Sequence, residues 1–373
     1  MSLRLDSESS ESSTYLVASQ WRLMWWKFRK HKVAVVCAGV LMLFYLGALF
    51  CEFFSPNDPH QRNARYVHAP AQKVKFFDEE GFHLRPFVYG ITGGGLDENW
   101  MRQYELDRSK KLQLYFFVQG APYRIWGLIP WDRHLIGTDD PNEPFYLLGA
   151  DHFGRDLLSR VIYGSRVSLS IGLVGVLLSL VIGCIMGGIS GYLGGVVDSV
   201  IQRLIELLMS LPTLPLWMGL GAALPSTWSP LQVYVGMVVI LSLIGWTGLA
   251  RVVRGKIMSL REEDFAMAAR LAGAGELRII RKHLLPSFFS YLIVHVTLSV
   301  PGMILAETAL SYLGLGLRAP VISWGVLLQQ AQSVQVITNY PWIMWPGAFI
   351  IVVVLAFNFV GDGLRDAADP YVR

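Results

Sequence analysis

The stretch AMAARLAGAGELRIIRKHLLP, from Ala266 to Pro286, carries four basic residues and His283. Apolar runs flank it on both sides, and each is about 20 residues long, the length that a helix needs to cross the hydrocarbon core of a bilayer. A basic segment between two such runs is expected to lie at a membrane surface. Its placement in the fold therefore depends on how many runs of this kind the chain holds.

The composition is that of a membrane protein. The chain has 373 residues, of which 53% are hydrophobic and 16% charged, and its mean hydropathy of +0.41 is too high for a soluble globular protein. Continuous apolar runs favour helices over the alternating strands of a barrel. We therefore predict an all-α polytopic membrane protein with six transmembrane helices, at Val33–Phe54, Val167–Ser190, Leu204–Leu224, Leu231–Ala250, Ser287–Leu310 and Trp342–Val360.

The charge distribution predicts the topology. Five basic residues precede the first run and place the N-terminus in the cytoplasm: Arg22, Lys27, Arg29, Lys30 and Lys32. Six spans then place the C-terminus and the opening stretch in the cytoplasm as well. Trp21–Lys32 is expected to be either an interfacial helix or a simple basic flank, and the first 30 residues lack the apolar region of a cleaved signal. The net charge of +4 makes nucleic acid an unlikely partner.

Two short helices are expected within the opening stretch and just before it. Alanine-rich Asp264–Leu271 has strong helix propensity, and Asp264 is the expected N-cap. Gly273 then supplies a turn, because glycine tolerates the left-handed backbone. A second helix, Glu276–Leu285, is expected to stop at Pro286. The predicted product is a basic helix–turn–helix with small side chains, suited to a groove in another protein.

The long segment between the first two runs predicts an external domain. Ser55–Arg166 is mostly polar and too long for a simple connection. Apolar stretches such as LQLYFFV, Leu112–Val118, indicate a small β-rich fold. Asp151, His152, Arg155 and Asp156 at its end could form a metal or acid–base cluster, but a salt-bridged turn that fixes the domain is the favoured interpretation.

Glycine and proline mark places where spans pack closely or break. Four glycines lie four residues apart, which favours close helix packing on one face, with a hinge as the alternative: Gly183, Gly187, Gly191 and Gly195. Pro212 and Pro215 are expected to interrupt the third span and Pro301 the fifth, and broken helices often line a pathway. Glu307 is a carboxylate within a span, so it either faces a pathway or bonds to a neighbouring helix.

The opening stretch resembles the EAA loop of binding-protein-dependent ABC transporter permeases. The pattern of that loop is A-A-x-x-x-G, then nine residues, an apolar position, any residue, L and P. Ala268, Ala269, Gly273, Leu285 and Pro286 match it. Met267 stands where the pattern has Glu, and His283 stands where Ile is usual. Three other stretches are similar to the C-type subunit of dipeptide and oligopeptide permeases: Leu148–Leu169, Glu307–Gly325 and Asn358–Pro370.

The resemblance implies a permease subunit of an ATP-driven importer in a bacterial inner membrane. Expected partners are a second homologous permease, two ATP-binding subunits and an external solute-binding protein. ATP and Mg²⁺ would be bound by those subunits, because Gly255–Lys256 lacks the other residues of a P-loop. This chain is expected to bind no metal or cofactor and to have no catalytic residue. Peptides are the expected cargo, with nickel chelates, glutathione, peptide antibiotics and oligosaccharides as alternatives.

The resemblance also implies domain limits and residue roles. Residues 1–32 form the cytoplasmic segment, 33–54 the first span, 55–166 the external insertion and 167–373 a five-helix permease domain with the coupling loop at about 255–286. The residues that would couple this chain to the ATPase are Met267, Ala268, Ala269, Gly273, His283, Leu285 and Pro286. Glu307, Ser311 and Pro301 are candidates for a path or gate, and Asp151, Gly154, Arg155 and Asp156 form an external motif.

A secondary transporter would need paired ionisable residues in several spans, and a membrane enzyme would need a nucleophile or metal ligands there.

Overall fold

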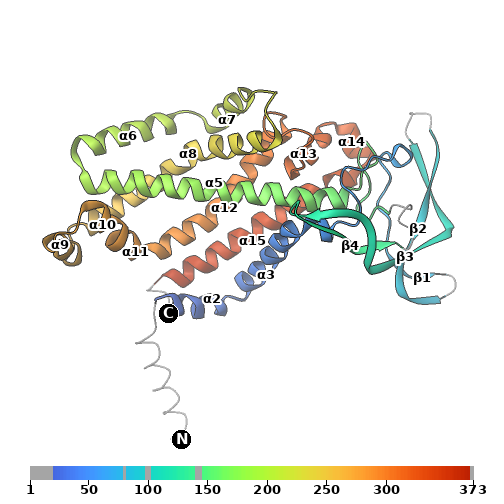
Figure 1. Cartoon of the computed structure of the whole chain (residues 1–373), viewed down its shortest axis with the longest axis horizontal. Helices are drawn as coiled ribbons and strands as arrows, with labels where there is room; N and C mark the ends of the chain where they lie inside the picture. The colour runs from blue at the N-terminus through green and yellow to red at the C-terminus, as the bar shows by residue number, and fades with distance from the viewer. Residues whose placement is uncertain (1–19, 79–80, 97–101, 139–144, 370–373) are drawn as a thin grey trace, which may run out of the picture.

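The computed structural model describes residues 20–78, 81–96, 102–138 and 145–369. The molecule is elongated. A bundle of long helices occupies its middle, an antiparallel sheet lies at one end, and short helices from the opening stretch lie at the opposite end (Figure 1). The two ends are therefore separated by the full length of the bundle.

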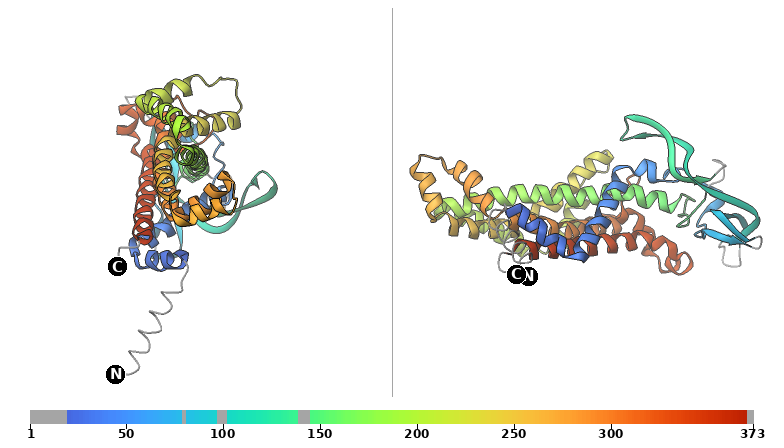
Figure 2. Two further views of the ribbon diagram at one scale, coloured as in Figure 1. Left: turned by 90° about the vertical axis from the view of Figure 1, so that its left-hand side faces the viewer. Right: turned by 90° about the horizontal axis from the view of Figure 1, so that it is seen from below.

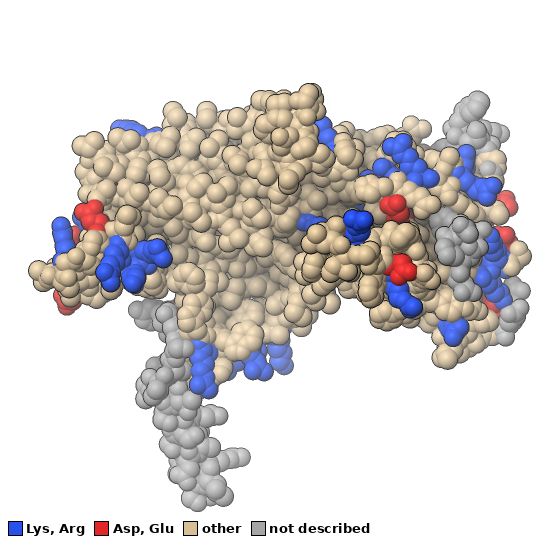
Figure 3. All heavy atoms as spheres, in the orientation of Figure 1, with Lys and Arg blue, Asp and Glu red and all other residues tan. Residues whose placement is uncertain are grey.

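Within the described residues, five helical segments are long and apolar enough to cross a membrane. The helices that form them are α3 (Lys32–Leu49), α5 (Leu157–Leu193), α8 (Pro230–Leu260), α12 (Phe289–Tyr312) and α15 (Trp345–Ala368). Charged side chains gather toward the two ends of the face shown in Figure 3, with a further basic group at its lower edge, and the broad area between them carries almost none. This distribution is what a bilayer requires around a bundle of spanning helices.

The third predicted span is not a single straight helix. It consists of α6 (Gly195–Ser210) and α7 (Thr213–Ala222), which are bent by 86° at their junction, so the chain has six spans only if this pair counts as one. The break follows from Pro212: the residue before it, Leu211, adopts an extended backbone with ψ of 134°, as the proline ring demands. Pro215 lies inside the first turn of α7, where a missing N–H has little cost.

Helix α5 packs closely on α8 through three of the four predicted glycines. An added Cβ at Gly187 would lie 2.4 Å from the Ala250 carbonyl oxygen, and one at Gly191 would lie 2.6 Å from that of Arg254. Gly183 faces Leu249 in the same way. Gly195 does not belong to this face: α5 ends at Leu193, the chain turns at Gly194, and Gly195 begins α6.

Pro301 does not interrupt the fifth span, contrary to the prediction. Helix α12 continues from Phe289 through Tyr312, with Pro301 buried inside it. The side chains of Thr297 and Ser299 bond to carbonyls one turn earlier, and neighbouring helices enclose this part of α12. Packing by neighbouring helices thus accompanies a continuous helix although proline removes one backbone bond.

The sheet lies within the predicted insertion. Its four strands are antiparallel neighbours in chain order: β1 (Lys75–Asp78), β2 (Gly81–Leu96), β3 (Arg102–Ile125) and β4 (Ile129–Thr138). Val88 opposite Leu112 and Phe116 opposite Ile136 illustrate the register. A small core of Val88, Leu112, Leu114 and Phe145 supports one face. Asp156 caps α5, so residues 157–166 at the end of the predicted insertion already belong to that helix.

Short elements complete the fold. Helix α2 precedes α3 and is separated from it at His31, and the others lie in the loops at both ends of the bundle. They are α2 (Gln20–Lys30), α4 (Cys51–Phe54), η1 (Ala64–Tyr66), α9 (Asp264–Leu271), α10 (Glu276–Ile279), η2 (Ile280–Leu284), α11 (Leu285–Ser287), α13 (Trp324–Leu328), η3 (Gln329–Gln332), α14 (Val334–Asn339) and η4 (Pro341–Met344).

Candidate functional site

The first helix of the opening stretch, α9, begins as predicted, but with a different cap. Glu263 is the N-cap residue, with an extended backbone and no side-chain cap bond, and Asp264 is the first helical residue. A carboxylate in the first turn still interacts favourably with the positive end of the helix dipole. The prediction that Asp264 caps this helix is therefore wrong by one position.

The turn after α9 depends on Gly273, which has φ of 78°. Its N–H donates a hydrogen bond to the Arg270 carbonyl, and the N–H of Ala274 donates one to the Ala269 carbonyl. This pair of hydrogen bonds is the pattern of a Schellman C-cap. A Cβ at Gly273 would meet no atom within 4 Å, so the requirement for glycine comes from the backbone angle rather than from crowding. Residues with a side chain are strained at this angle.

The second helix does not stop at Pro286, contrary to the prediction. It passes from α10 into a wide π-type turn, η2, and then into α11, which contains Pro286. In the wide turn the Leu285 N–H bonds to the Ile280 carbonyl, five residues earlier. Pro286 then occupies an early position of a new short helix, where its missing N–H is tolerated. The chain bends at Phe288, two residues later.

An apolar cluster holds this coupling segment, residues 264–287, against the bundle. Ala266, Ile279 and Leu284 are buried and belong to the same cluster as Val253 and Ile257 of α8. Ala269 and Leu285 are half-buried against it. The segment is therefore anchored to the end of α8 on one side and continues directly into α12 on the other.

The opposite face of the coupling segment presents apolar side chains outward. Leu271 is 89% exposed and Leu277 75% exposed, and Phe265 and Met267 are also exposed. Ala268, His283 and Pro286 are exposed as well, so the predicted coupling residues divide between an anchored and an outward face. Basic residues surround the apolar ones: Arg270, Arg278, Arg281 and Lys282. An apolar patch with a polar rim is typical of a protein–protein interface.

Sequence reasoning missed an ion pair near this segment. Asp198 of α6 accepts from Nε and Nη2 of Arg254 on α8, both at 2.5 Å, and also from the Ser190 hydroxyl. Arg261 donates to the carbonyls of Gly191 and Tyr192 at the end of α5. These contacts tie α5, α6 and α8 together at the end that carries the coupling segment.

Glu307 lies at the centre of a buried hydrogen-bond network. Its carboxylate has no solvent exposure and accepts from the hydroxyls of Ser168 at 3.2 Å, Ser311 at 2.8 Å and Ser323 at 2.8 Å. Each hydroxyl in turn accepts a backbone N–H, from Trp324, Leu317 and Val326 respectively. Glu307 thus organises the loop that follows α12. Its assignment to a path or gate stays a prediction.

A cavity of about 270 Å³ lies beside the preceding part of α12, between His295 and Met303. Helices α5, α7, α8 and α12 line it, and its polar lining includes Ser179, Trp217, His295 and Ser299. The Ser179 hydroxyl and the Trp217 indole N–H are buried and have no hydrogen-bond partner in the structure. Both groups are therefore available to a polar group that enters the cavity.

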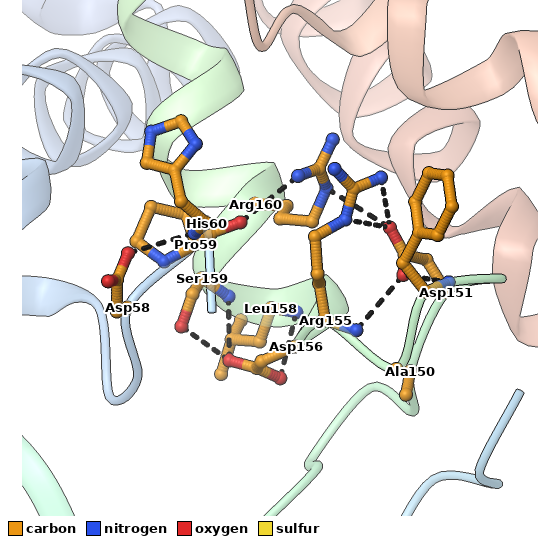
Figure 4. Close-up of polar contacts among 12 residues, drawn as sticks. Asp58, Pro59, His60, Ala150, Asp151, Arg155, Asp156, Leu158, Ser159 and Arg160 are labelled. Carbon is orange, nitrogen blue, oxygen red and sulfur yellow. Dashed lines mark hydrogen bonds and ion pairs between the residues drawn. The ribbon is translucent and has the colours of Figure 1, made fainter. Parts of the chain in front are cut away.

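The external motif is a folded turn held by charge. Asp151 is fully buried, accepts the backbone N–H groups of Phe153 and Arg155 through Oδ1, and pairs with the Arg155 guanidinium at 2.7 Å through Oδ2 (Figure 4). Arg160 lies 3.5 Å from the same oxygen and donates to the Pro59 carbonyl at 3.0 Å.

Two further residues of this motif fix the start of α5. Asp156 accepts from the N–H groups of Leu158 and Ser159, which caps the helix. An added Cβ at Gly154 would lie 1.9 Å from the Asn63 carbonyl oxygen, and its φ is 70°. Among the described residues no group of three His, Cys, Asp or Glu side chains could hold a metal ion.

The comparisons with known proteins agree with this architecture. Residues 179–373 match the family described as "Binding-protein-dependent transport system inner membrane component", and residues 19–71 match the "N-terminal TM domain of oligopeptide transport permease C".

Among similar proteins are two from Bacillus subtilis and one from Haemophilus influenzae. The oligopeptide transport system permease protein OppC of B. subtilis is 36% identical over 241 residues, 64% of this chain and 76% of that protein. The dipeptide transport system permease protein DppC of B. subtilis is 39% identical over 65% of this chain and 73% of that protein. OppC of H. influenzae is 38% identical over 65% and 76%.

Three observations lead to one assignment. They are the long apolar helices, the anchored segment between α8 and α12, and the family match over more than half of the chain. The chain belongs to the family of binding-protein-dependent transport permeases, and it is a multi-pass membrane permease subunit of an ABC importer complex.

Proposed function

We propose that this chain imports peptides and that the outward face of its coupling segment docks on an ATP-binding subunit. The observation that carries the docking proposal is the pair of faces on residues 264–287. One face is buried in the cluster with Val253 and Ile257, while Leu271 and Leu277 extend outward at 89% and 75% exposure. Because the segment is anchored in this way, a displacement of it by a partner subunit would also displace α8 and α12.

The proposed complex has two permeases, two ATP-binding subunits and an external solute-binding protein. ATP and Mg²⁺ belong to the ATP-binding subunits, and this chain has no catalytic role. ATP-driven closure of those subunits moves the coupling segments together, and the attached helices open the path to the outside. In this arrangement both termini lie in the cytoplasm, the sheet lies outside, and the membrane is the bacterial inner membrane.

Peptides are favoured as cargo because the similar proteins are named as oligopeptide and dipeptide permeases. The path is proposed to pass between the two permeases. The cavity lined by Ser179, Trp217, His295 and Ser299 provides hydrogen-bonding groups of the kind that a peptide backbone uses. No charged side chain is among its lining residues, which is compatible with peptides of varied sequence.

The docking proposal is tested by placing a charge on the outward face. We expect Leu271→Asp to release the ATP-binding subunits during purification of the complex from membranes and to abolish uptake. The matched control is Leu84→Asp, because Leu84 is 86% exposed but lies in the sheet at the opposite end. Normal uptake and full retention of the ATP-binding subunits in Leu271→Asp would rule out docking at this face.

The cargo is tested separately on the intact complex in vesicles with its binding protein. We expect uptake of a radiolabelled tripeptide, with competition by unlabelled peptides and none by a nickel chelate or glutathione. Uptake of one of those solutes in place of the peptide would reject the peptide proposal and leave the docking proposal untouched.

A further inference from the structure

The hairpin of β3 and β4 has an apolar tip that the import mechanism does not explain. Its loop is Trp126–Gly127–Leu128, between the paired residues Ile125 and Ile129. Trp126, Leu128 and Ile129 are 49%, 77% and 50% exposed, and the nearby Trp131 is 49% exposed. Hairpin loops in water are usually built from Gly, Asn, Asp, Ser and Pro. Here two of the three loop residues are large and apolar.

The tip is fixed beside the end of a spanning helix. The Trp126 indole N–H donates to the Leu49 carbonyl at 2.8 Å, and the Trp126 ring contacts the Phe50 ring at 5.6 Å between centroids. Further down the hairpin, Phe117 contacts Phe53. Leu49 is the last residue of α3. The hairpin tip therefore lies level with the end of α3.

The length of α3 sets the depth of that level in the membrane. Its 18 residues rise about 27 Å in an α-helix, close to the roughly 30 Å of hydrocarbon in a bilayer. Leu49 consequently lies near the boundary between the hydrocarbon and the headgroups. Met42, Leu43 and Leu46 of α3 are exposed, so an outward apolar surface runs along this helix toward the hairpin.

The base of the hairpin is tied to the residue that follows α4. His134 of β4 is buried, and its two ring nitrogens lie 2.6 Å from the Ser55 carbonyl oxygen and 3.0 Å from that of Ala121. Figure 2 shows the hairpin projecting sideways beyond the helices. The Ser55 contact at the base and the Leu49 contact at the tip together place the tip beside the end of α3.

We propose that the tip of this hairpin inserts into the headgroup region of the bilayer on the side of the sheet. Tryptophan is enriched at this depth because its ring is apolar and its N–H is polar. Arg124 and Arg133 are exposed on the two strands near the tip, where their guanidinium groups can reach lipid phosphates. The hairpin thus adds a lipid contact that steadies the external domain above the membrane.

Spin labels on single cysteines test this proposal in the complete complex. Cys37, Cys51 and Cys184 are first replaced, and then Leu128→Cys is labelled in vesicles of phosphatidylethanolamine and phosphatidylglycerol. We expect the label to collide more often with oxygen than with a water-soluble nickel complex. Leu84→Cys is the control, because Leu84 is equally apolar and 86% exposed on β2, and its label should favour the nickel complex. Ile129→Cys repeats the measurement at a second tip position.

Two outcomes would overturn the proposal. A tip label with the same nickel accessibility as the Leu84 control would mean that the tip lies in water. A tip label shielded from both oxygen and nickel would mean that a protein, such as the second permease or the binding protein, covers the tip instead of lipid. The measurement does not depend on the cargo or on ATP, so it stands apart from the tests of the proposed function.

Discussion

The turn before α5 and the coupling segment are held on the helix bundle by different forces. Directional polar contacts hold the turn, with Asp151 fully buried between Arg155 and Arg160. At the opposite end the coupling segment rests on an apolar cluster that includes Ile257 and Leu284. Ion pairs and hydrogen bonds fix one geometry, whereas apolar contacts are non-directional and tolerate small shifts. The structure thus combines a turn held by directional charged contacts with a coupling segment held by apolar packing.

The strongest test of this comparison is Asp151→Ala. The change leaves Arg160 buried without its carboxylate, and breaking such a pair costs about 3–5 kcal/mol of unfolding free energy. Thermal unfolding of the detergent-solubilised protein should show a clear fall in Tm. The control is Asp366→Ala, because Asp366 is exposed at the other end of the bundle. Equal Tm values for both variants would mean that the external end is not fixed by this charge cluster.

Glu307→Ala is expected to have the next largest effect. It deprives the hydroxyls of Ser168, Ser311 and Ser323 of their acceptor, and leaving buried donors unsatisfied costs about 1–3 kcal/mol. Glu307→Gln retains one acceptor oxygen and should lose less stability. A Glu307→Gln variant with unchanged Tm but no uptake would show that the carboxylate acts in a path or gate rather than only in the loop structure.

Gly273→Val should affect stability less and uptake more. A side chain at φ of 78° costs roughly 1–2 kcal/mol, and the turn that aims α9 and α10 would be distorted. Gly275 offers a matched control, because its φ is −67° and its surroundings are equally open. We expect uptake to be lost in Gly273→Val and retained in Gly275→Val, with both proteins inserted in the membrane. Equal uptake in the two variants would show that the turn does not transmit force.

The smallest predicted effect concerns pH at the external end. Burial, together with the charge of His152, lowers the pKa of His68 to about 4, although Asp151 acts in the opposite direction. A histidine whose folded pKa is depressed contributes stability above its unfolded pKa and loses it as the pH falls toward the folded value. The Tm should therefore decline between pH 6.5 and 4.

His68→Phe isolates this contribution. The His68 ring stacks on Tyr340 at 4.0 Å, and phenylalanine keeps a ring there without titrating. The decline in Tm between pH 6.5 and 4 should be shallower in this variant than in the unmodified protein. An identical decline in both proteins would assign the acid sensitivity to other groups.

The sequence was sufficient to predict the helical membrane class, the β-containing region and three of the four glycine contacts expected along α5, because each has a strong local pattern. Gly273 was predictable for the same reason. The position of the break between α6 and α7 was predictable, because Pro212 marks it. Its angle of 86° was not predictable, because it depends on what packs around the break.

The partners of Glu307 and Asp198 could not be predicted. Ser168 is 139 positions from Glu307, and Arg254 is 56 positions from Asp198. Serine and arginine at those positions have no distinguishing spacing, so only the folded chain brings them together. The π-type turn before Pro286 was missed because a proline usually ends a helix, and the wide turn removes that conflict.

The length of helix α5 determines how a movement at one end of the bundle would displace the other end. It contains 37 residues and is therefore about 55 Å long, well beyond the thickness of the hydrocarbon core. Its start is fixed in the Asp156 turn, and its end lies beside Arg254 and Arg261. A helix of this length acts as a lever: a tilt of about 5° around its midpoint displaces each tip by roughly 2 Å. A movement at the end that carries residues 264–287 would thus reach the end that carries the sheet through one continuous helix.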